Sequence, residues 1–197
     1  ACQRAITREA TAWWPARSVH SMGMCGIVGF AGRLAAGHTE RTLGILHAAT
    51  DTVAHRGPDG AGYWAEADQP VALGHRRLSI IDLSEAAGQP MLSANGRHVV
   101  VFNGELYNFR ALRDELEGLG HTFATEGDTE VLLNGCRQWG PVEFASRIKG
   151  MFAFAYADLE EGILWLGRDR FGEKPLYWAV WDGSLAFGSE LKALHAL

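Results

Sequence analysis

The stretch GMCGIVGFAG, residues 23–32, sets both the fold and the central chemical question of this chain. A cysteine stands at the front of an apolar, glycine-punctuated run that predicts a β-strand over residues 25–31. A cysteine in such a strand is commonly an inert core residue. Here Cys25 directly follows Met24, the pattern on which removal of an initiator methionine acts, and the glycines after it would leave room beside the thiol. Cys25 is therefore either a packing residue or a nucleophile at the start of a strand.

A free α-amine next to the thiol would complete the second interpretation. Such an amine has a pKa of about 7.7–8.0, so it accepts a thiol proton near neutral pH. A buried lysine would need its pKa lowered by about 2–3 units to do the same. If Cys25 were the first residue of the mature chain, one residue would supply both the nucleophile and its base, without a histidine partner.

Length and composition describe an ordinary globular chain of 197 residues, 47% hydrophobic and 21% charged, which suits one domain. A net charge of −5 without any block of lysine or arginine disfavours nucleic acid and anionic membranes as partners. The apolar runs are far shorter than the roughly 20 residues that span a bilayer. The cysteines Cys2, Cys25 and Cys136 show neither a disulfide pattern nor zinc spacing, which favours a reducing, cytoplasmic compartment.

Periodicity and turn signals divide the rest of the chain into elements. Helices are predicted within residues 39–56 (with Thr39 as N-cap), 107–120, 127–140, 141–150 and 190–197. Strands are predicted within residues 71–83 and 98–103, and in two hairpins over 151–169 and 176–189. The RGPDGAG segment at 56–62 predicts a loop, and Asn103-Gly104 predicts a turn that ends its strand. This order lacks the regular alternation of a parallel sheet, so we expect an α+β fold of antiparallel sheets with helices outside them.

Nine motifs then follow one another in a family order from residue 24 onward. They are MCGIVGF (24–30), HRGPDGAG (55–62), LGHRRLSIIDLS (73–84), GQPM (88–91), FNGELYNF (102–109), GDTEVLL (127–133), GMFAFAYAD (150–158), GRDRFGEKPLYW (167–178) and SELKAL (189–194). Together they resemble the glutaminase domain of asparagine synthetase, a class II glutamine amidotransferase domain. The RGPDG sequence resembles this branch more than the branches that make phosphoribosylamine or glucosamine phosphate. The resemblance implies an N-terminal-nucleophile hydrolase fold, a four-layer α/β/β/α sandwich of two antiparallel sheets, over residues 25–197.

The resemblance also implies catalytic residues. Cys25 would attack the side-chain amide of glutamine, and Asn103 and Gly104 would form the oxyanion hole. This assignment is chemically sound, because a side-chain amide N–H and a backbone N–H can both point at one developing O⁻.

Substrate-binding residues follow from the same resemblance. Arg77 would bind the α-carboxylate of glutamine, since a planar guanidinium binds a carboxylate bidentately. Asp128, with Glu105 nearby, would accept the α-ammonium. The main chain around Leu78, Ser79, Ile80 and Ile81 would line the same pocket.

Several of these residues have plainer alternatives. Arg76 rivals Arg77 by adjacency, although alternation along a strand sends the two side chains to opposite faces. Asp128 lies where a helix begins and is also a candidate N-cap. Arg56 and Asp59 could pair to hold the 56–62 loop over bound glutamine. Lys174 is either structural or a surface charge, the histidines (His47, His55, His75, His98 and His121) are structural or exposed, and Cys136 belongs to the core.

The implied reaction converts glutamine and water to glutamate and ammonia through a thioester on Cys25. The ammonia would serve ATP-dependent synthesis of asparagine from aspartate in a synthetase domain that is absent from this chain and is expected C-terminal to it. No metal or cofactor is implied for the present domain, and ATP and Mg²⁺ would belong to the synthetase domain. A homodimer is left open.

Residues 1–24 lack helical or alternating periodicity and are interpreted as a non-native, upstream or flexible extension outside the fold. Since the mechanism needs Cys25 at the N-terminus, we expect the natural start at Met24 or cleavage of the segment. Two other functions are kept. The domain could feed ammonia to another acceptor, such as a sugar or polysaccharide precursor, or it could be a catalytically silent interaction module with a blocked Cys25.

Overall fold

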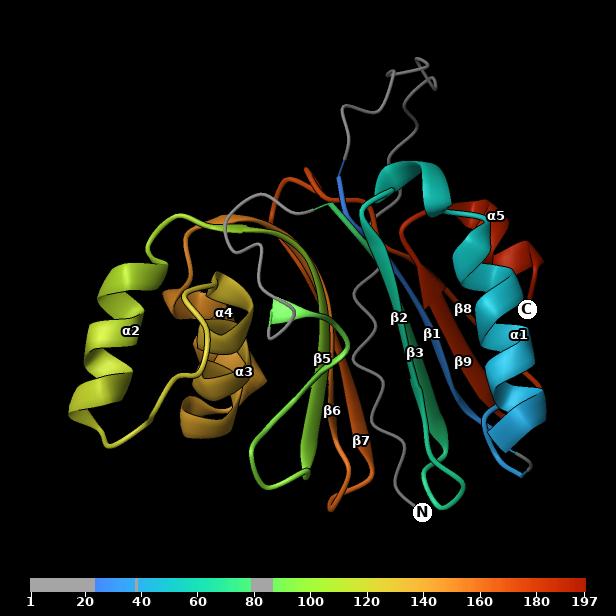
Figure 1. The fold of residues 1–197 in the computed structure, drawn as a ribbon, viewed down its shortest axis with the longest axis horizontal. Coiled ribbons are helices and arrows are strands. Elements are labelled where there is room, and N and C mark those ends of the chain that lie inside the picture. The colour runs from blue at the N-terminus through green and yellow to red at the C-terminus, as the bar shows by residue number, and fades with distance from the viewer. Residues whose placement is uncertain (1–23, 38, 79–86) are drawn as a thin grey trace.

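The computed structural model describes residues 24–37, 39–78 and 87–197. Over these ranges, a pair of antiparallel sheets packs face to face (Figure 1). The first sheet has the strand order β2-β3-β1-β9-β8, made of β1 (Gly26–Gly32), β2 (Gly60–Ala65), β3 (Val71–Arg77), β8 (Tyr177–Trp181) and β9 (Ser184–Gly188). The second has the order β4-β5-β6-β7, made of β4 (Met91–Leu92), β5 (His98–Leu106), β6 (Gly150–Asp158) and β7 (Ile163–Arg168).

Helices cover the outer face of each sheet (Figure 1). The first sheet carries α1 (Thr39–Asp51) and α5 (Leu191–His195), with a short 3₁₀ helix η1 (Ala54–Arg56) after α1. The second carries α2 (Phe109–Gly118), α3 (Asp128–Trp139) and α4 (Pro141–Arg147). The four layers are therefore helix, sheet, sheet and helix, which confirms the predicted α+β sandwich.

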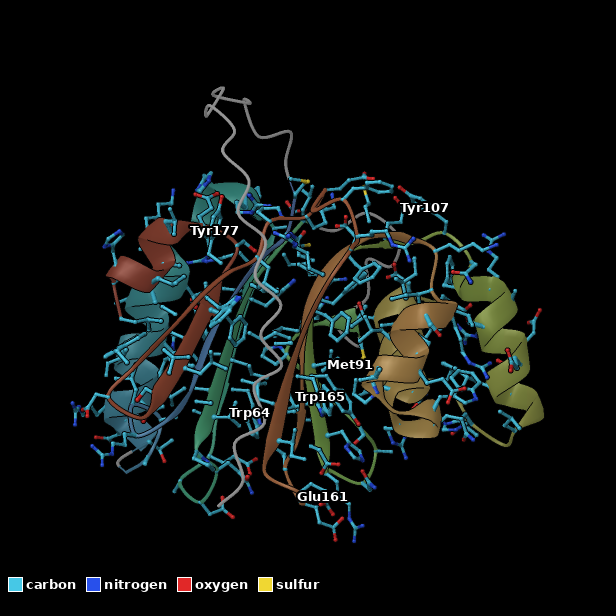
Figure 2. The ribbon with its side chains drawn as sticks, turned by 180° about the vertical axis from the view of Figure 1, so that it is seen from behind. Trp64, Met91, Tyr107, Glu161, Trp165 and Tyr177 are labelled. Atoms are coloured by element: carbon cyan, nitrogen blue, oxygen red, sulfur yellow. The ribbon has the colours of Figure 1, made fainter. Side chains whose placement is uncertain are left out.

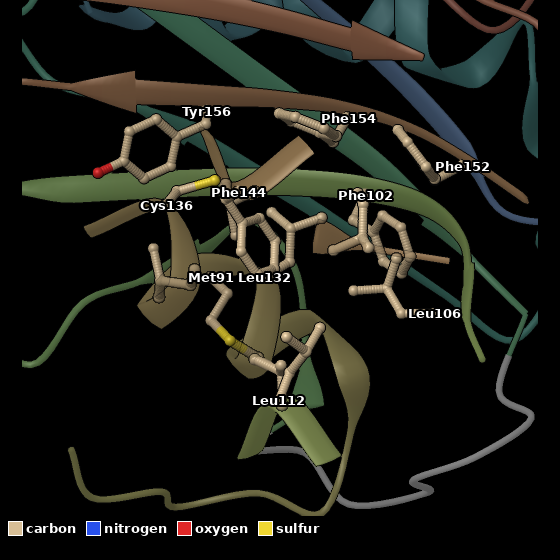
Figure 3. Close-up of a cluster of buried hydrophobic side chains, with 14 of the residues drawn as sticks. Met91, Phe102, Leu106, Leu112, Leu132, Cys136, Phe144, Phe152, Phe154 and Tyr156 are labelled. Carbon is tan, nitrogen blue, oxygen red and sulfur yellow. The ribbon is translucent and has the colours of Figure 1, made fainter. Parts of the chain in front are cut away.

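Strand alternation explains why both faces of each sheet are buried. In β6 the alanines Ala153, Ala155 and Ala157 face the other sheet, while the aromatic residues between them face the helices. On the helical side, Phe154 and Phe102 pack with Leu132 of α3 (Figure 3). The core between the sheets contains Ile27, Trp64, Val71, Leu73, Val99, Val101, Ala153, Ala155, Ala157 and Phe187.

Glycines let the layers approach closely. A Cβ at Gly29 of β1 would overlap the ring of Phe187 and the carbonyl oxygen of Ala72. A Cβ at Gly26 would lie 3.0 Å from Cγ2 of Val53. The expectation that these glycines leave room beside the thiol is wrong, because core side chains fill the space above them.

Several predicted boundaries shift in the structure. The β2 strand, which the sequence did not predict, begins at Gly60 inside the expected 56–62 loop, because Gly60 pairs with Arg77 of β3. Thr39 is the first residue of α1 and not its N-cap. The helix predicted within residues 107–120 ends at Gly118, and Leu119, just beyond it, is 53% exposed. The predicted hairpin within residues 176–189 is confirmed, and Asp182 and Gly183 form its turn with φ of 45° and 70°.

We predict opposite effects for alanine at two glycines. Gly29→Ala forces a methyl group into the packed layer and should lower the free energy of unfolding by about 1–3 kcal/mol. Gly44→Ala, in α1 with no atom within 4 Å of the new Cβ, should raise it by about 0.5–1 kcal/mol. Urea unfolding of both variants measures the two changes, and equal effects would contradict the close packing at Gly29.

Candidate active site

A pocket lies at the end of the layer between the sheets, where β1 begins and where β3 and β5 end. Tyr107 follows β5 at this end of the molecule, whereas Glu161, in the turn between β6 and β7, marks the opposite end (Figure 2). The pocket is lined by Met24, Cys25, His75, Arg77, Leu78, Ala87, Gln89, Phe102, Asn103, Gly104, Glu105, Gly127, Asp128, Thr129, Met151 and Lys174. The structure thus gathers every predicted site residue that it describes.

The period of two along each strand accounts for this gathering. Cys25 lies two residues before Ile27, which points between the sheets, and Asn103 lies two residues beyond the inward-pointing Val101. Both side chains therefore continue the inner faces of their sheets to the point where the apolar core ends. Chemistry-bearing residues replace the core residues at that end of the sandwich.

The Cys25 thiol is partly buried and held by the main chain. Its Sγ lies 3.6 Å from the carbonyl oxygen of Leu78 and accepts from the Leu78 N–H at 3.4 Å. The carbonyl oxygen of Cys25 accepts a hydrogen bond from Nε of Arg56 at 3.0 Å. Burial raises the pKa of the thiol, against the lowering effects of the Leu78 hydrogen bond and of Arg77 and Arg56. The thiol is therefore protonated at neutral pH and needs a base to become a nucleophile.

His75 is the imidazole that lines this pocket in the described part of the chain, and it is unsuited to be that base. The side chain is fully buried in β3 and hydrogen-bonds with the backbone of Phe102 on the other sheet. Burial lowers its pKa to about 3, so it holds no proton at neutral pH. This confirms the structural interpretation of His75. The His75 imidazole therefore cannot serve as the base for the Cys25 thiol.

Asn103 and Gly104 lie in β5, which runs through the pair to Leu106, so the predicted turn is wrong. Asn103 is 1% exposed, and its Nδ2 has no hydrogen-bond partner among the described residues. A buried amide donor without a partner is costly and marks a site that a ligand can satisfy. Gly104 is required by close approach, since a Cβ there would overlap the carbonyl oxygen of Met151 on β6.

The edge of β5 presents the Gly104 N–H toward the pocket. The N–H of Phe102 donates to Oε1 of Gln89 at 2.6 Å, and the N–H of Leu106 donates to Oδ2 of Asp128 at 2.9 Å. Successive N–H groups of a strand point to opposite edges, so the N–H of Gly104 points to the same edge, between these two. The side-chain donor of Asn103 and the main-chain donor of Gly104 thus line one cavity.

Asp128 lines the pocket, and it is not the N-cap of its helix. It is the first residue of α3 and is 6% exposed, with Gly127 at the N-cap position. Burial raises its pKa to about 6, against the lowering effects of hydrogen bonds from the main chain of Leu106, Asp128 and Thr129. The carboxylate therefore holds the start of a helix and also lines the pocket, together with Glu105 of β5.

Arg77 lines the pocket, whereas Arg76 turns to the outer face of the sheet and pairs with Asp51 of α1. The predicted separation of the two arginines is confirmed. Leu78 also lines the pocket. Ser79, Ile80 and Ile81 lie outside the described residues, as does the predicted extension up to residue 23.

Three residues at or beside the pocket were missed or misread from the sequence. Lys174 is 5% exposed, so its interpretation as a surface charge is wrong. Arg56 is 4% exposed and pairs with Glu190 at 3.2 Å, a partner that the sequence did not indicate. Gln89 supports β5 and donates to Oγ1 of Thr129 at 3.2 Å, and its place in the GQPM motif was the signal that could have indicated it.

In the described residues no cluster of three or more His, Cys, Asp or Glu side chains could hold a metal ion. None of the helices described there is long and apolar enough to cross a membrane.

The raised pKa of Asp128 predicts a pH-dependent stability. Because the folded-state pKa of about 6 exceeds the usual value of 3.8, the folded state binds the extra proton between these values. This group's stabilising contribution is therefore complete below pH 4 and is lost as pH rises through 6, by on the order of 2 kcal/mol. Asp128→Asn should gain stability relative to the parent between pH 4 and 7, measured by urea unfolding. Asp114→Asn, exposed on α2, is the matched control, and a pH-independent difference for Asp128→Asn would contradict the assignment.

Known proteins resemble this chain in sequence and in fold. Residues 24–197 match the family model described as glutamine amidotransferase domain. The chain is 42% identical over 171 residues to glutamine-hydrolyzing asparagine synthetase 1 of Bacillus subtilis, covering 87% of this chain and 26% of that protein. It is 44% identical over 141 residues to asparagine synthetase B of Escherichia coli, covering 71% and 24%. It thus spans about a quarter of the length of these curated relatives.

A solved structure shares the fold alone. Glutamine phosphoribosylpyrophosphate amidotransferase from B. subtilis superposes with a TM-score of 0.73 at 23% identity, over 87% of this chain and 43% of that one. This likeness confirms the predicted N-terminal-nucleophile amidotransferase fold. With the family match over residues 24–197, the chain belongs to the glutamine amidotransferase domain family.

Proposed function

We propose that this domain hydrolyses glutamine to glutamate and ammonia, and that the ammonia serves ATP-dependent synthesis of asparagine from aspartate in a further synthetase domain. One observation carries the hydrolysis: a thiol, an unpartnered buried amide and two opposite charges line the same pocket. These are the groups that an α-amino acid with a side-chain amide requires. The relatives named asparagine synthetase support the ammonia acceptor.

Arg77 and Asp128 match the two charges of the amino-acid head group. The Arg77 guanidinium would bind the α-carboxylate with two N–H donors. The Asp128 carboxylate would accept the α-ammonium, with Glu105 beside it on β5. Binding a cation would favour the ionised form of Asp128 and offset its burial, so part of the binding energy repays the cost of that buried charge. The side-chain amide would then reach toward Cys25.

The proposed reaction has two chemical steps. Sγ of Cys25 attacks the amide carbon, and the C–N bond breaks to release ammonia and leave a thioester. Water then attacks the thioester, giving glutamate and the free thiol. In both steps the oxygen carries negative charge, which Nδ2 of Asn103 and the N–H of Gly104 would stabilise.

The α-amine of Cys25 is the base that we propose. The neutral thiol cannot give its proton to His75, whose pKa is about 3. A terminal amine with a pKa near neutrality can take this proton and pass it to the departing ammonia. This role requires cleavage of the bond between Met24 and Cys25.

Cofactors and the ammonia acceptor would lie outside this domain. ATP and Mg²⁺ would bind the synthetase domain, which we place in the region of the relatives that this chain does not cover. An ammonia acceptor other than aspartate stays a candidate, because one relative is not named as an asparagine synthetase. Amidase chry2 of Gibberella zeae is 34% identical over 180 residues, covering 88% of this chain and 26% of that protein. Assays of asparagine formation by the protein that carries the domain would decide between them.

Exposure of the Cys25 amine is the first test. Protein that begins at Cys25 should release ammonia from glutamine, and protein that keeps residues 1–24 should be slower by about 10²–10⁴-fold, since an amide nitrogen is not a base. Mass spectrometry fixes the N-terminus of each sample, and coupled glutamate dehydrogenase measures ammonia. Full activity with the extension attached would refute the single-residue mechanism. No activity in either sample would favour a silent interaction module.

The oxyanion hole gives the second test. Asn103→Ala should lower kcat by about 10²–10³-fold with little change in KM, because the donor acts on the transition state. The control is Asn108→Ala, which removes hydrogen bonds to Arg147 and Lys149 outside the pocket and should keep kcat. A rise in KM at unchanged kcat for Asn103→Ala would mean that this amide only binds substrate.

A further inference from the structure

Lys174 is a buried cation of the pocket to which the proposed chemistry gives no role. It is 5% exposed, whereas Lys149 and Lys192 are exposed. Asp169 fixes the loop that carries it, because its carboxylate accepts the N–H groups of Phe171, Glu173 and Lys174 at 2.9–3.1 Å. The loop therefore holds the Lys174 main chain in one place at the pocket wall.

The ammonium of Lys174 meets a sulfur and not a carboxylate among the described residues. Its Nζ lies 2.8 Å from Sδ of Met24, a weak acceptor, and in the described part of the chain it forms no ion pair. Burial lowers its pKa, and Arg56 lowers it further, while the Cys25 thiolate and Glu105 raise it. A buried charge without a partner costs stability, so such a group is commonly retained for chemistry.

Geometry places this charge beside the nucleophile's nitrogen. Met24, which Lys174 contacts, is bonded directly to the nitrogen of Cys25. Standard covalent dimensions put Nζ within about 9 Å of that nitrogen. When Met24 is removed, as the proposed function requires, the Lys174 ammonium loses its contact with the Met24 sulfur and lines the same pocket as the new terminal amine of Cys25.

We propose that Lys174 is a positioning residue that keeps the Cys25 amine unprotonated near neutral pH by placing a fixed positive charge beside it. This inference rests on the proposed function, since it assigns a partner to the proposed base. Two unit charges at such a distance disfavour the second protonation by an amount that corresponds to about 0.5–1 pH unit. A base that is free at neutral pH accepts the thiol proton without first losing its own.

Other charged residues around the pocket also act on the pKa of the Cys25 amine. Arg56 of η1 and Arg77 of β3 are positive, and Arg56 is paired with Glu190. Glu105 of β5 and Asp128 of α3 are negative, and Glu173 adjoins Lys174 in its loop. His75 is neutral. Arg56 also contacts Met24, but through its main-chain carbonyl oxygen, and its guanidinium is paired with Glu190. Lys174 instead brings the charged end of its side chain against Met24.

The test uses protein whose first residue is Cys25, as parent and as Lys174→Met, Lys174→Arg and Lys149→Met. The first readout is direct titration of ¹⁵N-labelled Cys25 amine by NMR. The second is kcat/KM for glutamine between pH 5 and 10. Methionine is close to lysine in length and removes the buried charge, so the variant should keep its fold, which thermal unfolding checks. Lys149→Met controls for loss of an exposed positive charge.

Lys174→Met should raise the titration midpoint of the amine and the acid limb of kcat/KM by about 0.5–1 pH unit. Activity at pH 6.5 should fall about 3- to 10-fold and recover toward pH 9. Lys174→Arg and Lys149→Met should keep both values of the parent. An unchanged midpoint, or a loss of activity that is equal at every pH, would overturn the inference. If the parent itself releases no ammonia, the proposed function fails, while the NMR midpoint still decides the role of Lys174.

Discussion

Close packing of two antiparallel sheets is the constraint on which the rest of this structure depends. Ala153, Ala155 and Ala157 of β6 face the other sheet, and Gly29 of β1 accommodates the ring of Phe187. Small residues at these positions bring the two backbones near each other along the whole sandwich. At its open end, side chains of β3 and β5 therefore meet that of Cys25, just before β1, in one pocket, although they lie far apart in the chain. The site is the continuation of the core, with polar residues in place of apolar ones.

The electrostatics of the pocket follow from the same burial. Desolvation keeps the Cys25 thiol and the His75 imidazole neutral and raises the pKa of Asp128 to about 6. The pKa of Lys174 in the same cavity is also lowered by burial, so four titratable groups there are shifted toward their uncharged forms, and Arg77 adds a positive charge. A cavity of this kind favours a substrate with its own paired charges, because each charge brought in meets a counter-charge already held in place.

The sequence predicted the features that depend on strand period and on ordered motifs. Alternation alone separated Arg76 from Arg77, and the motif order indicated the family and the four layers. It failed where tertiary contacts override local preference. Asn103-Gly104 has the composition of a turn, yet pairing with β6 keeps it extended, and the glycine serves a close approach. The sequence left Lys174 open between a structural residue and a surface charge, because its burial depends on a loop fixed by Asp169, a contact that spacing does not reveal.

Met24 would connect the proposed cleavage before Cys25 with the shape of the site. Its N–H donates to the carbonyl oxygen of Arg56 at 3.0 Å, and its side chain lines the pocket against Lys174. While Met24 is attached, the nitrogen of Cys25 is an amide without basicity, and a thioether occupies a portion of the wall. Under the proposed cleavage before Cys25, three things would change together: a base would form, the Met24 side chain would leave the wall beside the thiol, and the Lys174 ammonium would lose its contact. In this proposal, the chemistry and the shape of the cavity both depend on the peptide bond between Met24 and Cys25.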